Sequence, residues 1–188
     1  MTLRAVLFDL GDVIMREETE RKIDNVTQTA DLVPGMADLL RRLNNEGMPL
    51  GLVADTRIGT YQNVLRQHGL YEIFDAFAIS DELGCAKPDR RMFEHALVVL
   101  GIPHSEWPDV AMVGNNLVRD IRGANALGLI SIWSAWNQRY PIAPADDLEK
   151  PRFQVGSTEQ LAALLDALKT EGTSHEHTHP RLFPWEVE

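Results

Sequence analysis

The sequence predicts an α/β fold, a three-layer sandwich whose middle layer is a doubly wound parallel sheet. Short apolar runs alternate along the chain with segments in which hydrophobic residues recur at helical spacing. This alternation is typical of a parallel sheet covered by helices on both faces. The 188 residues suit a single domain of this kind. Polar residues directly follow several of the apolar runs, and ligands in such sheets bind beyond the carboxyl ends of the strands.

Five apolar runs are predicted to form the strands. Each has four or five residues and carries no charge, as expected of a strand that helices bury on both faces. In chain order they are residues 5–8, 50–54, 76–79, 110–113 and 130–133.

Helices are predicted between and after these strands. In the first, Met36, Leu39, Leu40 and Leu43 recur at the i, i+3, i+4, i+7 spacing of an amphipathic helix. The other helices are predicted at residues 61–68 and 93–100, through 121–124, and at 161–168, where Ser157 and Gln160 fit a capping box before the last one.

Two stretches fall outside this pattern. Residues 16–32 are polar and weakly patterned, and at most a short helix is expected around Ile23 and Val26. The composition changes near residue 171, so we expect residues 1–170 to form the core and residues 171–188 a tail, either flexible or docked on the same or another subunit. The tail carries three alternating histidines, for which a solvated segment is favoured over a metal site: His175, His177 and His179.

Charge and composition exclude several classes of function. The formal net charge is −10, and the sequence shows no cluster of basic residues that could bind nucleic acid. Both observations argue against nucleic-acid binding. No apolar run is long enough to span a membrane or to serve as a signal peptide. The single cysteine, Cys85, excludes an intramolecular disulfide. We therefore expect a cytoplasmic protein without membrane or nucleic-acid partners.

Polar groups that suit phosphate or a metal follow four successive strands. Asp9 follows the first strand, Asp55 and Thr56 the second, Lys87 lies shortly after the third, and Asn115 and Asp120 follow the fourth. A single acid in such a place is usually a helix cap or a turn residue. The joint pattern favours a site, because Lys87 and Asp120 are not at cap positions.

Four segments resemble, in order and spacing, the motifs of the haloacid dehalogenase-like hydrolase superfamily. They read FDLGDVI at 8–14, LVADT at 52–56, CAKPD at 85–89 and VGNNLVRDI at 113–121. The likeness covers about residues 4–134, and the Lys-Pro pair followed by the Gly-Asn…Asp-Ile segment is its most specific part. It implies a Rossmann-like sheet with the Asp9 strand at its centre.

The resemblance also implies a Mg²⁺-dependent phosphomonoester phosphatase that works through an aspartyl-phosphate. Asp9 is implied as the nucleophile, and Lys87 as the cation that keeps Asp9 ionised and stabilises charge on the transferring group. Mg²⁺ is implied to bind the carboxylates of Asp9 and Asp120 and the backbone carbonyl of Gly11. The implied phosphate-binding residues are Asp55, Thr56, Lys87 and Asn115.

Three positions depart from the usual phosphatase pattern of that superfamily. Gly11 replaces a second aspartate that acts as general acid, Ala54 replaces a phosphate-binding hydroxyl, and Asn115 replaces an acid. A general acid contributes about 10²–10⁴-fold, so an attenuated activity or an acid from elsewhere is expected. Asp12 is one candidate acid, although a turn residue is the favoured interpretation. The alternative function is a catalytically weakened protein that binds a phosphorylated ligand or a protein partner.

No separate cap domain is predicted. About twenty residues lie between Ile14 and Pro34, too few for a packed helical bundle. The open site argues against dehalogenase chemistry, which needs a closed apolar pocket. It fits a large or extended phosphorylated substrate, or a homo-oligomer that builds a lid between subunits. The residues after the fifth strand are expected either to flank the site or to pack the sheet edge: Trp133, Trp136, Arg139 and Tyr140.

Overall fold

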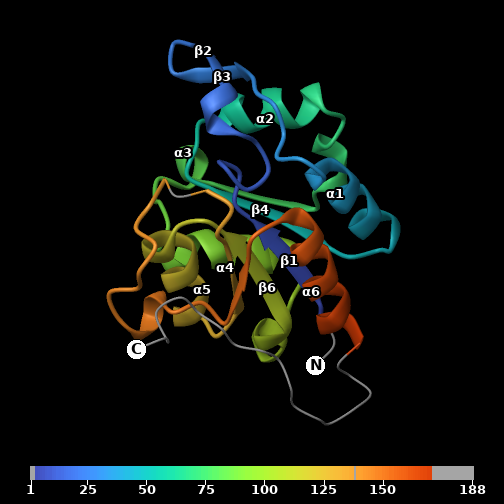
Figure 1. Ribbon diagram of the computed structural model, residues 1–188, viewed down its shortest axis with the longest axis vertical. Helices are drawn as coiled ribbons and strands as arrows, with labels where there is room; N and C mark the ends of the chain where they lie inside the picture. The colour runs from blue at the N-terminus through green and yellow to red at the C-terminus, as the bar shows by residue number, and fades with distance from the viewer. Residues whose placement is uncertain (1–2, 138, 171–188) are drawn as a thin grey trace.

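The computed structural model describes residues 3–137 and 139–170, and a six-stranded parallel sheet lies at its centre (Figure 1). The strand order is β5-β4-β1-β6-β7-β8, which places β1 between β4 and β6. All neighbouring strands of this sheet pair in parallel. The strands are β1 Ala5–Phe8, β4 Leu50–Ala54, β5 Ala76–Ile79, β6 Val110–Gly114, β7 Ile130–Ser134 and β8 Phe153–Val155.

Helices cover both faces of the sheet, which confirms the predicted three-layer sandwich. Those of one face are α1 Met36–Asn45, α2 Ile58–Gln67 and α6 Thr158–Thr170, and their buried residues share one hydrophobic cluster. On the other face, α4 Arg90–Val99 and α5 Arg122–Ala126 contribute to a second cluster. The remaining helical segments are η1 Glu17–Thr19, η2 Tyr71–Ile73, α3 Ser80–Leu83, η3 His104–Asp109, the π-helix η4 Leu117–Ile121 and η5 Asp147–Glu149.

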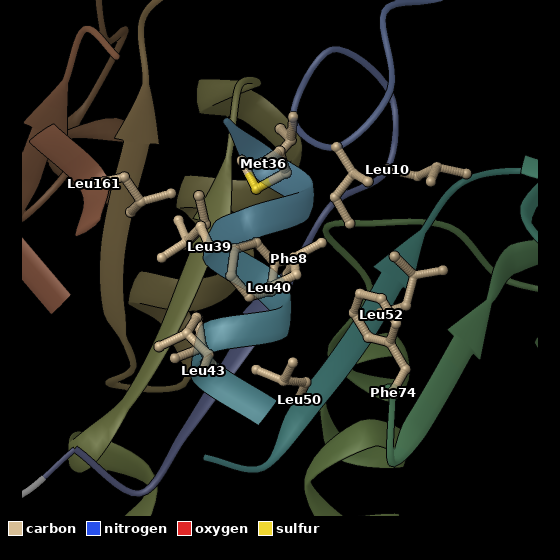
Figure 2. Packing of buried hydrophobic residues seen from close by; sticks show 14 of the residues in the cluster. Phe8, Leu10, Met36, Leu39, Leu40, Leu43, Leu50, Leu52, Phe74 and Leu161 are labelled. Carbon is tan, nitrogen blue, oxygen red and sulfur yellow. The ribbon is translucent and has the colours of Figure 1, made fainter. Parts of the chain in front are cut away.

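The alternation of side chains along β1 divides the core between these two faces. Val6 and Phe8 belong to the cluster beneath α1, whereas Ala5 and Leu7 belong to the cluster beneath α4. This follows from the two-residue period of a strand. The predicted apolar stripe of α1 packs into the first cluster, where Leu40 lies beside Phe8 (Figure 2). Burying each large side chain of this kind contributes roughly 1.5–3 kcal/mol.

The five predicted strands are confirmed, and β8 is an additional one at the edge of the sheet. β8 has only three residues, and Phe153 and Gln154 are partly exposed. So short a run gives no periodicity from which a strand could be predicted. The predicted capping box is present in part, because Gln160 N donates to Ser157 Oγ (3.3 Å) while Gln160 Oε1 accepts from Gly156 N (2.7 Å).

The expected short helix around Ile23 and Val26 is wrong, because these residues form a β-hairpin. Its strands are β2 Arg21–Ile23 and β3 Val26–Thr29, which pair antiparallel. Asp24 and Asn25 link them with φ values of 49° and 62°. A two-residue turn with both φ values positive fits the twist of a hairpin, and Asp and Asn tolerate it better than most residues.

The hairpin packs on α2, and it shares the segment between β1 and α1 with only the short η1. Thr27 N donates to Thr60 Oγ1 at 3.0 Å, and a Cβ placed on Gly59 would lie 2.7 Å from Val26 Cγ1. Figure 1 shows the hairpin projecting beyond α2, away from the layers of the sandwich. Among the described residues, no helix is long and apolar enough to cross a membrane. The tail at 171–188, with its histidines, lies outside the described residues.

The tight contact between α4 and α5 gives a test of the packing. A Cβ added to Gly123 of α5 would lie 2.3 Å from two carbons of the buried Phe93 ring. We expect Gly123→Ala to lower the free energy of unfolding, because overpacking costs about 1–3 kcal/mol. The gain in helix propensity offsets at most about 1 kcal/mol of this. Urea denaturation measures the change.

Gly156→Ala is the matched control. A Cβ there meets only Gln160 Oε1 at 3.4 Å, so its free energy of unfolding should stay within about 0.5 kcal/mol of wild type. Equal stability of the Gly123 and Gly156 variants would show that the α4–α5 contact is looser than described.

Candidate functional site

The residues that the sequence predicts for the site all line one pocket at the carboxyl end of the sheet. The pocket has a volume of about 200 Å³ and polar walls. The loops after β1, β4 and β6 and the segment after α3 each contribute to it. The predicted residues that it brings together are Asp9, Gly11, Asp55, Thr56, Lys87, Asn115 and Asp120.

The Lys87 ammonium lies at the centre of this arrangement. Its Nζ atom is 2.6 Å from Asp9 Oδ1 and 2.7 Å from Asp120 Oδ1, and it donates to the Val53 carbonyl at 2.8 Å. The ammonium thus donates hydrogen bonds to Asp9 and Val53 and forms an ion pair with Asp120. The side chain of Lys87 is only 2% exposed, and that of Asp120 only 1%. The ion pairs are therefore largely shielded from water.

Burial and the neighbouring charges change the pKa values of this cluster. Burial raises the pKa of the Asp9 carboxyl to about 7; Lys87 opposes the rise and Asp120 adds to it. Burial alone would lower the pKa of Lys87, but Asp120, Asp9 and Asp55 outweigh it and raise that pKa above its ordinary value. The lysine therefore stays charged, and its charge favours the ionised form of Asp9.

Asp120 approaches β6 closely because residue 114 is a glycine. A Cβ on Gly114 would lie 2.2 Å from Asp120 Cβ and 2.5 Å from its Oδ2. Asp120 Oδ2 accepts from Asn116 N at 2.9 Å, and Asn116 Oδ1 in turn accepts from Val118 N and Arg119 N. The segment is a π-helix, a form that often marks functional sites. Gly114 and the π-helical turn together direct Asp120 toward Lys87.

Asp55 and Thr56 line the pocket from the end of β4. Asp55 Oδ1 accepts from Lys87 N at 2.9 Å, which fixes the backbone that carries the lysine. Its Oδ2 is buried and accepts no hydrogen bond from the described residues, although Arg119 Nη1 lies 3.7 Å away. The Thr56 carbonyl accepts from Ser80 Oγ at 3.4 Å.

The three departures from the usual phosphatase pattern also lie in this pocket. Asn115 Nδ2 donates to the Gly11 carbonyl at 3.1 Å, and the Asn115 carbonyl accepts from Trp133 Nε1 at 3.0 Å. Ala54 is buried at the end of β4 and lines the pocket. Asn115 therefore links the loop after β6 to the loop after β1.

Asp12 adopts the turn conformation that the sequence favours, with φ of 53°. Its side chain does not line the pocket: Oδ1 accepts from Glu17 N at 2.8 Å, and Oδ2 from Arg139 Nη1 at 3.2 Å. Trp136 Nε1 donates to the Asp12 carbonyl at 2.7 Å. Trp136 and Arg139 thus brace the loop after β1, whereas Tyr140 lines the pocket.

Several pocket residues were not identified from the sequence. Glu17 of η1, Glu20, and Lys22 of β2 come from the polar segment before α1. Burial raises the pKa of the Glu17 carboxyl above its ordinary value, against the opposing effect of Arg139. The sequence shows that this segment is rich in charges and lacks periodicity. Such a pattern does not predict which side chains point into the pocket.

The oxygen atoms of the pocket fit a Mg²⁺ ion. Asp9 and Asp120 offer carboxylates and Gly11 a backbone carbonyl, the hard ligands that Mg²⁺ prefers. Asp120 Oδ1 is buried and, within the described residues, accepts no directed hydrogen bond, although Lys87 lies close. Such an oxygen has capacity left for a cation.

The family model of the haloacid dehalogenase-like hydrolases matches residues 9–128. The chain belongs to this family. The match spans the loop of Asp9, the Lys87 segment and the π-helix of Asp120, the parts that build the pocket. The segments that resemble the superfamily motifs therefore meet in one place.

Curated relatives within the family include named phosphatases. A glyceraldehyde 3-phosphate phosphatase of Pyrococcus furiosus is 30% identical over 78% of this chain and 58% of its own length. A phosphoserine phosphatase of Thermus thermophilus is 31% identical over 69% of this chain and 49% of its own. The chain thus spans about half the length of the curated relatives that it matches.

Solved structures of HAD-like proteins share the fold. The hydrolase YfnB of Bacillus subtilis, described as bound to magnesium, superposes with a TM-score of 0.71 at 17% identity, covering 88% of this chain and 100% of that one. A HAD phosphatase of Thermococcus onnurineus gives a TM-score of 0.68 at 19% identity, covering 88% and 98%. At these identities the likeness establishes the Rossmann-like α/β fold.

The buried charge cluster of this HAD-like protein predicts a pH-dependent defect when its lysine is removed. Lys87→Met leaves the carboxylates of Asp9 and Asp120 without their shared cation, so at pH 8 the free energy of unfolding should fall by about 3–5 kcal/mol. The raised pKa of Asp9, about 7, means that its ionisation costs folded stability as pH rises through that value. Removing the ammonium enlarges this cost, so the deficit should shrink toward pH 5.

Denaturation at pH 5 and pH 8 in EDTA measures both deficits. Lys87→Met/Asp120→Asn is the control, because one carboxylate fewer should recover part of the loss at pH 8. A deficit that is the same at both pH values would contradict the charge origin and indicate lost packing instead.

Proposed function

We propose that this protein is a Mg²⁺-dependent phosphomonoester phosphatase that works through an aspartyl-phosphate on Asp9. The observation that carries the proposal is the Asp9 carboxylate facing a polar pocket while a buried ammonium holds its Oδ1. Membership of the HAD-like hydrolases and the phosphatase names of its relatives support it.

In the first step, an Asp9 oxygen attacks phosphorus and the bond to the leaving alcohol breaks. Oδ1 is held by Lys87, so we assign the attack to Oδ2. Lys87 favours the ionised form of the nucleophile and offsets negative charge on the transferring group. In the second step, water attacks phosphorus, which releases phosphate and regenerates Asp9.

A Mg²⁺ ion would be held by Asp9, Asp120 and the Gly11 carbonyl, and would offset the repulsion between the nucleophile and the phosphate. Asn115 supplies no charge to this set, but its hydrogen bond orients the Gly11 carbonyl. Thr56, Asp55 and Asn115 are proposed to lie beside the phosphate, where Thr56 and backbone N–H groups replace the hydroxyl that Ala54 lacks.

The substrate is proposed to be a phosphorylated molecule that enters past the β2–β3 hairpin. The hairpin and Tyr140 contribute to the pocket, yet the segment between β1 and α1 contains no helical cap. A large or extended phosphomonoester therefore fits, and a lid from a second subunit remains part of this proposal. The polar walls do not suit dehalogenation of apolar substrates.

A second candidate function is binding without efficient turnover. Gly11 offers no side-chain acid, Ala54 no hydroxyl and Asn115 no charge. A protein of this kind would hold a phosphorylated ligand or partner at the same pocket and leave it intact.

Release of p-nitrophenol from its phosphate ester distinguishes the two candidates. We expect Mg²⁺-dependent turnover by the wild type and a loss on the order of 10³-fold or more in Asp9→Asn, because the nucleophile is gone. This leaving group departs without an acid, so Gly11 cannot mask a working nucleophile.

Asp38→Asn is the matched control, since the Asp38 side chain on α1 is 92% exposed and does not line the pocket. It should retain wild-type turnover. No turnover by the folded wild type over a wide range of Mg²⁺ concentrations would reject the phosphatase and leave the binding function.

A further inference from the structure

Hydrolysis of an alkyl phosphate requires a proton donor in this pocket, because an alkoxide is a poor leaving group. Lys87 is unsuited, since its ammonium already donates to Asp9 and Val53 and pairs with Asp120. One oxygen of Asp55 accepts from Lys87 N and one oxygen of Asp120 accepts from Asn116 N, which fixes both carboxylates beside Lys87. A further carboxyl, that of Glu17, lies in another part of the wall.

The Glu17 carboxyl occupies the space beside Gly11. A Cβ built on Gly11 would lie 2.0 Å from Glu17 Oε1 and 2.9 Å from its Cδ. A side chain at position 11 and the Glu17 carboxyl in its present position therefore exclude each other. Glu17 lines the same pocket as Asp9 and its side chain is 23% exposed, so a substrate bound there can reach it.

Contacts from two directions hold Glu17 in this position. Its backbone N donates to Asp12 Oδ1 at 2.8 Å, and its Oε2 pairs with Arg139 Nη1 at 2.5 Å. The same arginine binds Asp12 Oδ2. The pairing engages Oε2, while Oε1 is the atom that lies against Gly11.

The other pocket glutamate is engaged differently. Glu20 Oε1 accepts from the Thr27 hydroxyl at 2.5 Å, and Glu20 Oε2 pairs with Lys22 at 2.8 Å. Both carboxylate oxygens of Glu20 therefore bind residues of the β2–β3 hairpin. Glu17, by contrast, keeps Oε1 outside its ion pair with Arg139, beside Gly11 and in the pocket that Asp9 lines.

We propose that Glu17 is the general acid that protonates the leaving alcohol, an inference that rests on the proposed phosphatase function. As the bond from Asp9 to phosphorus forms and the ester P–O bond breaks, the Glu17 carboxyl gives its proton to the departing oxygen. In the second step, the Glu17 carboxylate takes a proton from the attacking water, and the bond from Asp9 to phosphorus breaks. Protons and bonds balance over the cycle.

First-turnover rates with two leaving groups test this role. We expect Glu17→Gln to slow cleavage of glycerol 2-phosphate by about 10²–10⁴-fold. Its first-turnover release of p-nitrophenol should fall far less, because that leaving group needs no proton. A residue that only shapes the pocket would affect both substrates alike.

Two further variants complete the experiment. Glu18→Gln is the matched control, because Glu18 lies in the same short helix with a side chain 65% exposed and paired with Arg16; it should leave both rates unchanged. In Glu17→Ala/Gly11→Asp the space beside residue 11 is cleared for a new carboxyl. This double variant should recover part of the alkyl phosphate activity that Glu17→Ala loses.

The outcomes distinguish a failure of the general-acid role from a failure of the phosphatase function. Equal losses on both substrates, or no loss on glycerol 2-phosphate, would overturn the role of Glu17 while the turnover of p-nitrophenyl phosphate by the wild type upholds the phosphatase. A folded wild type that releases no p-nitrophenol would overturn both.

Discussion

The buried Lys87 ammonium is the constraint on which the rest of the site depends. Asp9 and Asp120 each place a carboxylate within 2.7 Å of Nζ, and moving unpaired charges out of water costs several kcal/mol per ion. The cluster is therefore tolerable only when all its members are in place. That requirement draws together segments far apart in the sequence, and it holds the Asp9 carboxylate beside the ammonium at the wall of the pocket.

The parallel sheet supplies the convergence that this charge cluster needs. β1 lies between β4 and β6. The loops that carry Asp9, Asp55 and Asn115 therefore leave the sheet side by side at its carboxyl end. Apolar residues fill the strands themselves, and polar residues begin where the strands end. Gly114 then allows Asp120 to approach β6 within the distance at which it reaches Lys87.

The sequence was sufficient to predict five of the six strands and the residues that meet in the pocket at their carboxyl ends, because both depend on local patterns. Uncharged runs predict the strands, and a polar residue after each run predicts the carboxyl end of the sheet, where ligands bind. The β2–β3 hairpin was harder to predict, since its pairing depends on a left-handed turn at Asp24 and Asn25 within a charged segment. The position of Glu17 was beyond prediction, because it depends on Arg139, which is remote in sequence and follows a different strand.

The departures at residues 11 and 115 are physically connected. Asn115 donates to the Gly11 carbonyl, and the glycine leaves the space in which the Glu17 carboxyl lies. Residues that share a contact couple in their effects, so the consequences of these two positions do not add as independent losses. An aspartate at position 11 would displace Glu17, and the ion pair with Arg139 that helps to hold the loop would change with it. At this part of the pocket wall, the Glu17 carboxyl from η1 thus occupies the space that a side chain at residue 11 would fill.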